Sequence, residues 1–204
     1  MITRLQKALA ATLLTLTAAC AQAPQEPPQV TQGEWRVISE SSALSYVTVK
    51  AGEIAEVNGF DALTGSVSAD GAAQIDIALG SVNTGIDIRD ERMRDVFFEV
   101  AQNPTATISA QLDPATFASL AVGESISESI SATLSLKGIE APVEADVTAT
   151  RVAPDRVLVV SDEPVILYAS TWQLTDGLAQ LQQLASLPSI TPAVPVSFSI
   201  TFER

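Results

Sequence analysis

The chain has 204 residues, enough for one domain with a substantial core and too few for two comfortable ones. Its 24 acidic and 11 basic residues give a formal net charge of −13. A surface that acidic repels nucleic acid and anionic headgroups, so nucleic-acid binding is excluded. The sequence also contains no histidine, which removes the commonest general base and metal ligand.

The first 20 residues have the pattern of a secretory signal peptide. Arg4 and Lys7 form a basic start, and the uncharged apolar stretch 8–19 is well short of the roughly 20 residues that span a bilayer as a helix. Small residues precede the only cysteine, Cys20, in a manner that resembles a bacterial lipobox. The competing cleavage after residue 23 would place Pro24 first in the mature chain, a residue that signal peptidase generally rejects. We therefore predict that Cys20 is lipidated.

A tether and an envelope location follow from this N-terminus. Residues 21–33 contain three prolines and four glutamines with almost no apolar side chains, which predicts an extended tether without a core of its own. The residue after the cysteine is Ala21 rather than aspartate. By resemblance to bacterial sorting signals, this implies a periplasmic protein anchored to the outer membrane, with a soluble periplasmic protein as the alternative.

From Trp35 onward, short segments of alternating apolar and polar residues are separated by turn residues. Eight or more such strands predict an all-β sandwich or closed barrel, and the pattern alone does not choose between them. Two segments leave the alternation: a helical excursion near 88–101, capped by Asp87 or Asp90, and a C-terminal helix near 177–187, capped by Asp176.

The excursion lies within a run that resembles the signature region of the YceI-like family. No single piece of this run is unique, but the order and spacing of the pieces together are specific. The likeness is good over roughly residues 34–150 and looser in the C-terminal quarter. The matching pieces are Ser-Val-Asn-Thr-Gly at 81–85, Arg-Asp at 89–90, Phe-Phe-Glu-Val at 97–100, Pro-Thr-Ala-Thr at 104–107, Leu-Ser-Leu-Lys-Gly-Ile at 134–139 and Pro-Val at 142–143.

This resemblance implies that residues 34–204 form a single extended, lipocalin-like antiparallel β-barrel of about eight strands. It also implies that a long apolar molecule lies along the barrel axis: a polyisoprenoid, an isoprenoid quinone or a fatty-acid derivative. No other cofactor is expected. The residues expected to line the pocket, on the apolar faces of strands or on the covering helix, are Tyr46, Phe60, Phe97, Phe98, Leu134, Leu136, Trp172 and Phe198.

Two departures from the family pattern keep a second function open. Ser41 and Ser42 stand where family members often carry a histidine, and the leucine-rich segment 174–188 is not the common ending. The alternative is a structural or interaction domain of the envelope whose barrel is packed with its own side chains. The sequence does not indicate the oligomeric state.

Arg89, Arg92 and Arg94 fall within six positions and have two interpretations. They form either a helix surface neutralised by neighbouring acidic residues or a polar mouth that receives a ligand headgroup.

No catalytic or metal site is expected. Without histidine a Ser-His-Asp triad cannot form, and zinc, haem and iron–sulfur centres lack ligands. Glu144 and Asp146 could serve as a two-carboxylate hydrolase, but they alternate with apolar residues and are better explained as a solvated strand face. We therefore predict a binding protein rather than an enzyme.

Overall fold

The computed structural model describes residue 30 and residues 33–204, so the predicted signal peptide, Cys20 and most of the tether lie outside the described residues. Within the described part, no helix is long and apolar enough to cross a membrane. The strands of this part join in one antiparallel sheet. They are β1 (Trp35–Val37), β2 (Ala43–Lys50), β3 (Ile54–Phe60), β4 (Leu63–Val67), β5 (Ala72–Ala78), β6 (Val82–Asn83), β7 (Thr105–Gln111), β8 (Ser125–Leu136), β9 (Ile139–Ala153), β10 (Arg156–Ser161), β11 (Val165–Tyr168) and β12 (Ala193–Glu203).

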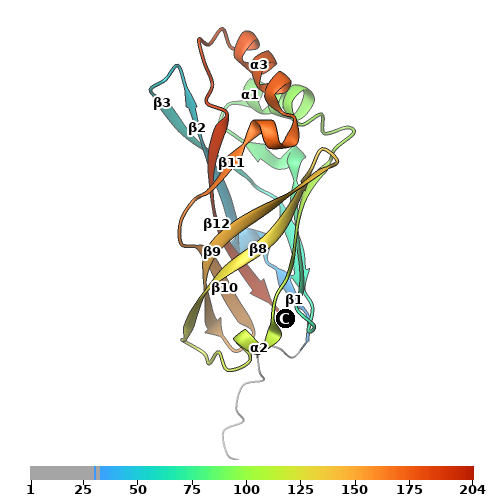
Figure 1. Cartoon of the computed structure of the whole chain (residues 1–204), viewed down its shortest axis with the longest axis vertical. Helices are drawn as coiled ribbons and strands as arrows, with labels where there is room; N and C mark the ends of the chain where they lie inside the picture. The colour runs from blue at the N-terminus through green and yellow to red at the C-terminus, as the bar shows by residue number, and fades with distance from the viewer. Residues whose placement is uncertain (1–29, 31–32) are drawn as a thin grey trace, which may run out of the picture.

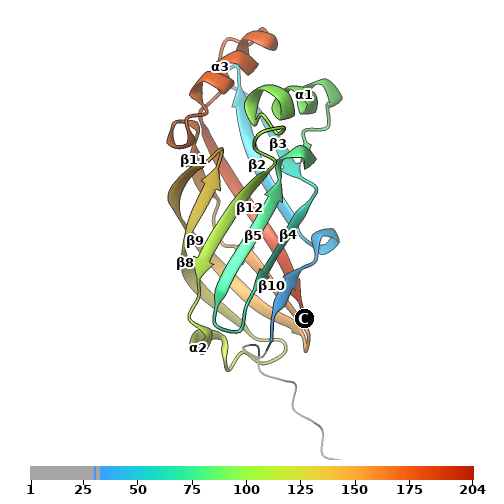
Figure 2. The same cartoon turned by 90° about the vertical axis from the view of Figure 1, so that its right-hand side faces the viewer.

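Eight of these strands close into a ring, which confirms the predicted barrel and excludes a sandwich. The order is β1-β4-β5-β7-β8-β9-β10-β12, and pairing of β12 with β1 completes the circle. Figures 1 and 2 show the resulting long barrel from two sides, with strands strongly tilted to its axis. Strand tilt of this kind is the geometric requirement for closing a sheet of eight strands.

The last strand, β12, holds the ring together because each of its edges carries two partners. Near its end, Phe202 pairs with Val37 of β1 on one side and Val157 of β10 on the other. Near its start, Val196 pairs with Tyr46 of β2 and Val165 of β11. β2 and β3 continue beyond the ring as a long hairpin at one end of the barrel (Figure 1).

Helices cover that end of the barrel. They are α1 (Asp87–Arg92), the π-helical turn η3 (Met93–Phe97) that continues it, the 3-10 turn η4 (Ala169–Trp172) and α3 (Thr175–Leu184). We call this the lid end (Figure 1). The short helix α2 (Pro114–Phe117) lies at the opposite end, which we call the closed end (Figure 1).

Both predicted helices exist, but their predicted caps are wrong. The N-cap positions are Ile86 and Leu174, and neither forms a side-chain cap hydrogen bond. Asp87, Asp90 and Asp176 instead fall inside the first turns, where a carboxylate still interacts favourably with the helix dipole. The first helix also passes into a π-turn and stops at Phe97, earlier than the predicted end near residue 101.

A buried arginine fastens the closed end. Arg151 of β9 is only 2% exposed and donates to the carbonyl oxygens of Leu120 (3.1 Å) and Pro154 (2.7 Å). The guanidinium of Arg204, the last residue, lies 5.0 Å from the ring centre of Trp35 on β1, which is a cation–π contact. These contacts tie loops and the C-terminus together across the closed end.

Close strand approach at Gly65 provides a test of the barrel geometry. Gly65 has a φ of +154°, and a Cβ there would lie 2.3 Å from the carbonyl oxygen of Gln74 on β5. We expect Gly65→Ala to lower the free energy of unfolding by about 3 kcal/mol, through backbone strain and steric overlap. Denaturant unfolding measures this loss.

The matched control is Gly85→Ala. Gly85 also has a positive φ, +72°, but a Cβ would meet no atom within 4 Å. This variant should lose only about 1 kcal/mol, the cost of the left-handed conformation. Equal losses in the two variants would contradict the close approach of β4 and β5.

Candidate functional site: a two-chambered interior

Two cavities are stacked along the barrel axis. The lower cavity, toward the closed end, has a volume of about 250 Å³, and the upper cavity, under the lid helices, about 390 Å³. The two share five wall residues, which we call the waist: Leu44, Ile108, Leu134, Leu167 and Val196. The same aliphatic side chains therefore line both cavities, which adjoin at this layer.

The lower cavity is almost wholly apolar because alternate residues of the ring strands point into it. Many of these inward residues are alanine or valine, which leave space that larger side chains would fill. Trp35 and Phe117 lie at its closed end, and the predicted Phe198 is in its wall. Its aliphatic lining includes Ala73, Ile75, Ala110, Ile130, Ala132, Val143, Ala145, Val147, Ala149, Val157, Val159 and Ile200.

The other predicted pocket residues line the upper cavity. Three rings follow one another there: Tyr46 lies 5.6 Å from Phe60, and Phe60 lies 5.8 Å from Phe98, between ring centres. Phe97 meets Phe98 edge to face at 4.9 Å. Leu136 belongs to the same wall, and Leu134 is in the walls of both cavities.

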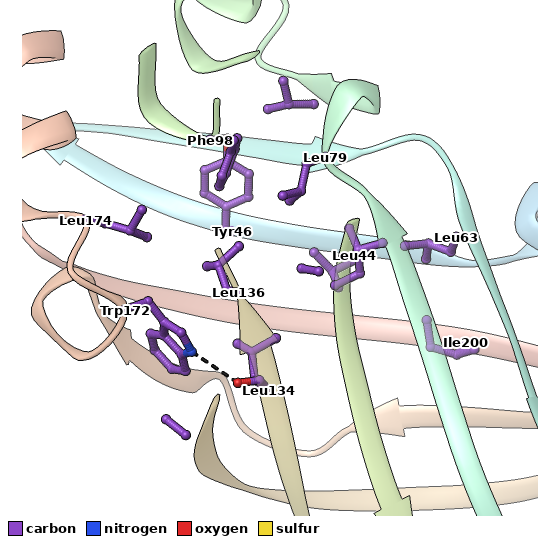
Figure 3. Packing of buried hydrophobic residues seen from close by; sticks show 14 of the residues in the cluster. Leu44, Tyr46, Leu63, Leu79, Phe98, Leu134, Leu136, Trp172, Leu174 and Ile200 are labelled. Carbon is purple, nitrogen blue, oxygen red and sulfur yellow. Dashed lines mark hydrogen bonds between the residues drawn. The ribbon is translucent and has the colours of Figure 1, made fainter. Parts of the chain in front are cut away.

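Trp172 belongs to the 3-10 turn η4 and not to a strand or to the covering helix, the two kinds of element expected to carry the pocket residues. Its indole is buried, and Nε1 donates to the carbonyl oxygen of Leu134 (3.1 Å), as the dashed line in Figure 3 shows. Figure 3 also labels Tyr46, Phe98, Leu136 and Leu174, which are buried and line the same cavity. This hydrogen bond fixes one wall of the upper cavity to the end of β8.

A cluster of charges lies where the β2–β3 hairpin meets α1. The Glu56 carboxylate accepts from Lys50 Nζ (2.9 Å) and from Arg89 Nη1 (2.6 Å). The hydrogen bond from Lys50, followed by that from Arg89, lowers the pKa of Glu56 against the opposing effect of burial. Arg89 Nη2 donates to the carbonyl oxygen of Thr84 (2.6 Å), and Asp90 accepts from the Thr84 amide (2.8 Å).

The three clustered arginines thus have different positions. Arg89 and Arg92 line the upper cavity, whereas Arg94 is not in its wall. Of the three, Arg89 alone forms a salt bridge within the described residues, and its partner Glu56 comes from β3 rather than from a neighbouring acidic residue of the helix. The polar part of the cavity wall therefore involves two of the three arginines.

Lys50, Glu56 and Asn58 in the upper cavity wall were not predicted as site residues. A usable signal exists for Lys50, because it continues the inward alternation of Leu44 and Tyr46 along β2. The strand β3 is harder to find, since its inward positions at 56 and 58 are polar and hide the expected alternation.

Tyr46 brings a neutral hydroxyl into this region. The side chain is 7% exposed, and burial raises its pKa well above the ordinary value, while Arg89 acts in the lowering direction and Asp90 in the raising direction. The phenol therefore stays protonated at every physiological pH and can donate a hydrogen bond.

The carboxylates of β9 lie on the outside of the barrel, as predicted. Glu144 and Asp146 are exposed and accept hydrogen bonds from Ser131 and Ser129 across the β8–β9 pair. Their surroundings are those of a solvated sheet face. In the described residues, no group of three or more acidic, histidine or cysteine side chains is arranged to hold a metal ion.

A closed eight-stranded antiparallel barrel with an internal apolar cavity is the architecture of lipocalin-like proteins. Comparison of the sequence with protein families is more specific than the architecture: residues 35–202 match the YceI-like domain. The chain therefore belongs to the YceI-like family. Comparison with curated proteins gives no match.

Solved structures agree with this assignment. A polyisoprenoid-binding domain from Saccharophagus degradans, implicated in plant cell wall breakdown, is 38% identical, with a TM-score of 0.81 over 83% of this chain and 97% of that one. BcnA from Burkholderia cenocepacia is 16% identical, with a TM-score of 0.61 over 81% and 98%. A YceI protein from Campylobacter jejuni is 14% identical, with a TM-score of 0.52 over 72% and 84%; these last two show the shared fold alone.

Removal of the Glu56 charge tests the cluster at the lid end. We expect Glu56→Gln to lower the free energy of unfolding by about 1 kcal/mol at pH 7, because Lys50 and Arg89 lose their shared partner. The pKa of Glu56 is lower in the folded than in the unfolded state, so its contribution is present above the unfolded pKa and is lost as pH falls through the folded pKa.

The difference between wild type and Glu56→Gln should accordingly shrink as pH falls below about 4.3, the ordinary carboxyl value. Urea unfolding over a pH series measures it. Glu53→Gln is the control, since Glu53 is exposed on the same hairpin and forms no salt bridge within the described residues. A difference that grows toward low pH would contradict this role of Glu56.

Proposed function

We propose that this protein binds a long apolar molecule in its barrel and serves in the bacterial envelope as a carrier or reservoir. The candidate ligands are a polyisoprenoid, an isoprenoid quinone or a fatty-acid derivative. One observation carries the proposal: two cavities with largely apolar walls lie inside the barrel and adjoin at the waist residues. The 38% identical Saccharophagus degradans domain, which binds polyisoprenoid, supports it.

Burial of the tail would provide the binding free energy. Transfer of about 400 Å² of apolar surface out of water is worth on the order of 10 kcal/mol before the costs of ordering and association. Such a site needs length and an apolar lining more than specific polar contacts. The lower cavity and the waist provide both.

The alternative is a barrel packed by its own side chains that acts through its outer surface. Packed protein interiors contain few voids larger than a water molecule. The volumes of about 250 and 390 Å³ are far larger than that and favour the binding function. Mass spectrometry of an organic extract of the purified mature protein is the direct comparison between the two functions.

A substitution that fills the lower cavity should further distinguish the binding function from the structural one. Ala132 points into the lower cavity, and we expect Ala132→Phe to reduce recovered long-chain ligand at least about tenfold while costing less than about 1 kcal/mol in stability. Thr133→Phe is the control, because the neighbouring Thr133 is exposed. Lipid recovery is measured by extraction and stability by thermal melting.

A packed barrel would behave in the opposite way. Ala132→Phe would then cost about 3 kcal/mol through overpacking, and the wild type would yield no lipid. That pair of results would overturn the carrier function and leave the structural one.

We also propose that the mature protein is an outer-membrane lipoprotein of the periplasm, anchored through Cys20 and held off the bilayer by residues 21–33. The small residues before Cys20 and the proline-rich sequence after it support this.

Cys20→Ser tests the anchor. Since a serine cannot take the thioether-linked lipid, the variant should move from the membrane fraction to the soluble periplasmic fraction, as immunoblotting of separated fractions would reveal. Continued sedimentation of Cys20→Ser with membranes would refute lipidation at this site.

A further inference from the structure

The outer face of the barrel changes character toward the lid end. Along β8 every outward position between residues 125 and 135 is serine or threonine. On β3, β2, β12 and β11, which lie side by side in that order, the outward positions near the lid are apolar instead (Figure 1). We call these residues the apolar panel: Ala55 and Val57 of β3, Val47 and Val49 of β2, Ala193 and Pro195 of β12, and Ile166 and Tyr168 of β11.

Strand alternation directs the panel outward. On β2, Tyr46, Thr48 and Lys50 line the upper cavity, so Val47 and Val49 between them point away from it. The other three strands behave in the same way, and their inward residues next to the panel all belong to cavity walls: Glu56, Asn58, Val165, Leu167, Val194 and Val196. Of the panel residues, Tyr168 at the end of β11 alone also contributes to a cavity wall.

Strand pairing makes the panel continuous. Val47 lies directly opposite Val57, and Ile166 lies directly opposite Pro195. The strands β12 and β2 pair where both enter the ring, and the chain just before β12 forms a bridge to the last residue of β2. The four strands therefore stay together over the lid half of the barrel. Because neighbouring strands lie about 4.8 Å apart, the panel is about 20 Å wide.

The panel is open to solvent in the part of the chain that the structure describes. Val57 is 72% exposed, Tyr168 54% and Ile166 47%. The inner face of the β2–β3 hairpin carries the salt bridge between Lys50 and Glu56, so this hairpin is polar inside and apolar outside, the reverse of the rest of the barrel. Contiguous apolar patches of several hundred square ångströms mark interaction surfaces on soluble proteins. An apolar face of this width therefore requires an occupant.

The chemistry of the panel favours a lipid surface over a protein partner. Protein interfaces carry about one hydrogen bond per 100–200 Å², whereas the hydroxyl of Tyr168 is the only polar side-chain group in the panel. Burial at the boundary of headgroups and acyl chains needs apolar area without directional contacts, and tyrosine is enriched at that depth. The net charge of −13 opposes anionic lipids, so the surface that fits is a zwitterionic bilayer.

The anchor proposed at Cys20 brings such a bilayer within reach. The carbonyl oxygen of Val30 accepts from Trp35 Nε1 (2.6 Å) at the closed end. Positions 20 and 30 are ten residues apart, which an extended chain spans in at most about 35 Å. Along β12, Pro195 is about 26 Å from the closed-end residue Glu203. The tether is therefore long enough for the barrel either to stand clear of the membrane or to lie on its side against it.

We propose that the apolar panel docks on the surface of a zwitterionic lipid bilayer and holds the lid half of the barrel against the membrane. Tethering raises the effective concentration of the bilayer, so a weak contact suffices. The inference goes beyond the carrier function, which does not require this surface, and it rests on the proposed anchor only for reach.

The test uses the mature chain with Cys20→Ser, which carries no lipid, and vesicles of phosphatidylcholine. We expect the chain to float with the vesicles, and Val57→Glu and Ile166→Glu each to lower the partition coefficient at least about tenfold, because a charge would enter the boundary region. Neither residue lines a cavity. The control is Thr133→Glu, which adds the same charge at an exposed position of β8 and should leave the partition unchanged. Thermal melting establishes that each variant is folded.

A gain of contact provides a second, position-specific readout. Val57→Trp should raise the partition coefficient several-fold, and its emission should shift to the blue when vesicles are added, because tryptophan favours the membrane interface. Thr133→Trp is the control and should show no shift. The native Trp35 and Trp172 are buried and contribute a constant background.

Partition that is unchanged by Val57→Glu and Ile166→Glu, without a blue shift in Val57→Trp, would overturn the docking surface. Stronger flotation with vesicles of about one-third phosphatidylglycerol would also overturn it, since basic residues and not the panel would then hold the membrane. A dimer of the wild type that Val57→Glu abolishes, together with no flotation, would assign the panel to a second copy instead.

The carrier function is read separately. Binding of geranylgeraniol, followed by the fluorescence of the two tryptophans, should be the same in Val57→Glu as in the wild type, because Val57 is outside both cavity walls. Flotation of a wild type that binds no geranylgeraniol would support the docking surface while counting against the carrier function. Binding of geranylgeraniol without flotation would overturn the docking surface and leave the carrier function intact.

Discussion

Closure of the sheet by β12 is the constraint from which the rest of the structure follows. Because β12 pairs with β1 and β2 on one edge and with β10 and β11 on the other, the circumference of the barrel is fixed by backbone hydrogen bonds and not by the size of the side chains inside it. Eight strands enclose room for side chains or for one slender ligand. Here the inward positions near the closed end include several alanines, so the ring holds open a space that its own residues do not fill.

The same inward alternation produces a different environment at the two ends. Along the ring strands it presents aliphatic side chains, and where β2 and β3 extend toward the lid it presents Lys50, Glu56 and Asn58. The helix α1 completes this polar end through the contact between Arg89 and Glu56. The interior thus has an apolar end and a polar end on one axis, which is the polarity of a single-chain lipid with a small headgroup.

Much of this could be predicted from the sequence, because alternation is a local property. The inward residues Leu134 and Leu136 of β8 and the lid residues Phe97 and Phe98 could be predicted from their spacing together with the family resemblance, which the pieces between residues 81 and 107 carry. The chamber boundaries could not be predicted, since they depend on which strands pair across the barrel. The break between β1 and β2 at Ser39–Ser41, which lets β12 pair with both, has no apolar period to reveal it. Prediction from the sequence fails most clearly at Glu56 and Asn58, which are polar and face inward. A rule that assigns polar residues to the outside of a barrel places both on the wrong face of β3.

The exceptions to that rule lie together, and this has an energetic meaning. An unfilled apolar cavity forfeits packing contacts, and an unpaired buried polar atom forfeits a hydrogen bond to water. The lower cavity and the unpaired buried atoms of Tyr46, Asn58 and Arg89 therefore each reduce the stability of the empty barrel. A ligand with an apolar tail would relieve the first of these costs by filling the lower cavity. Since a ligand that binds only the folded state stabilises it in proportion to the logarithm of its concentration over the dissociation constant, the fold and its cargo would be thermodynamically coupled. Local rules of sequence and structure are broken most often where a function requires it. In this barrel, the broken rules concentrate where β2, β3 and α1 meet.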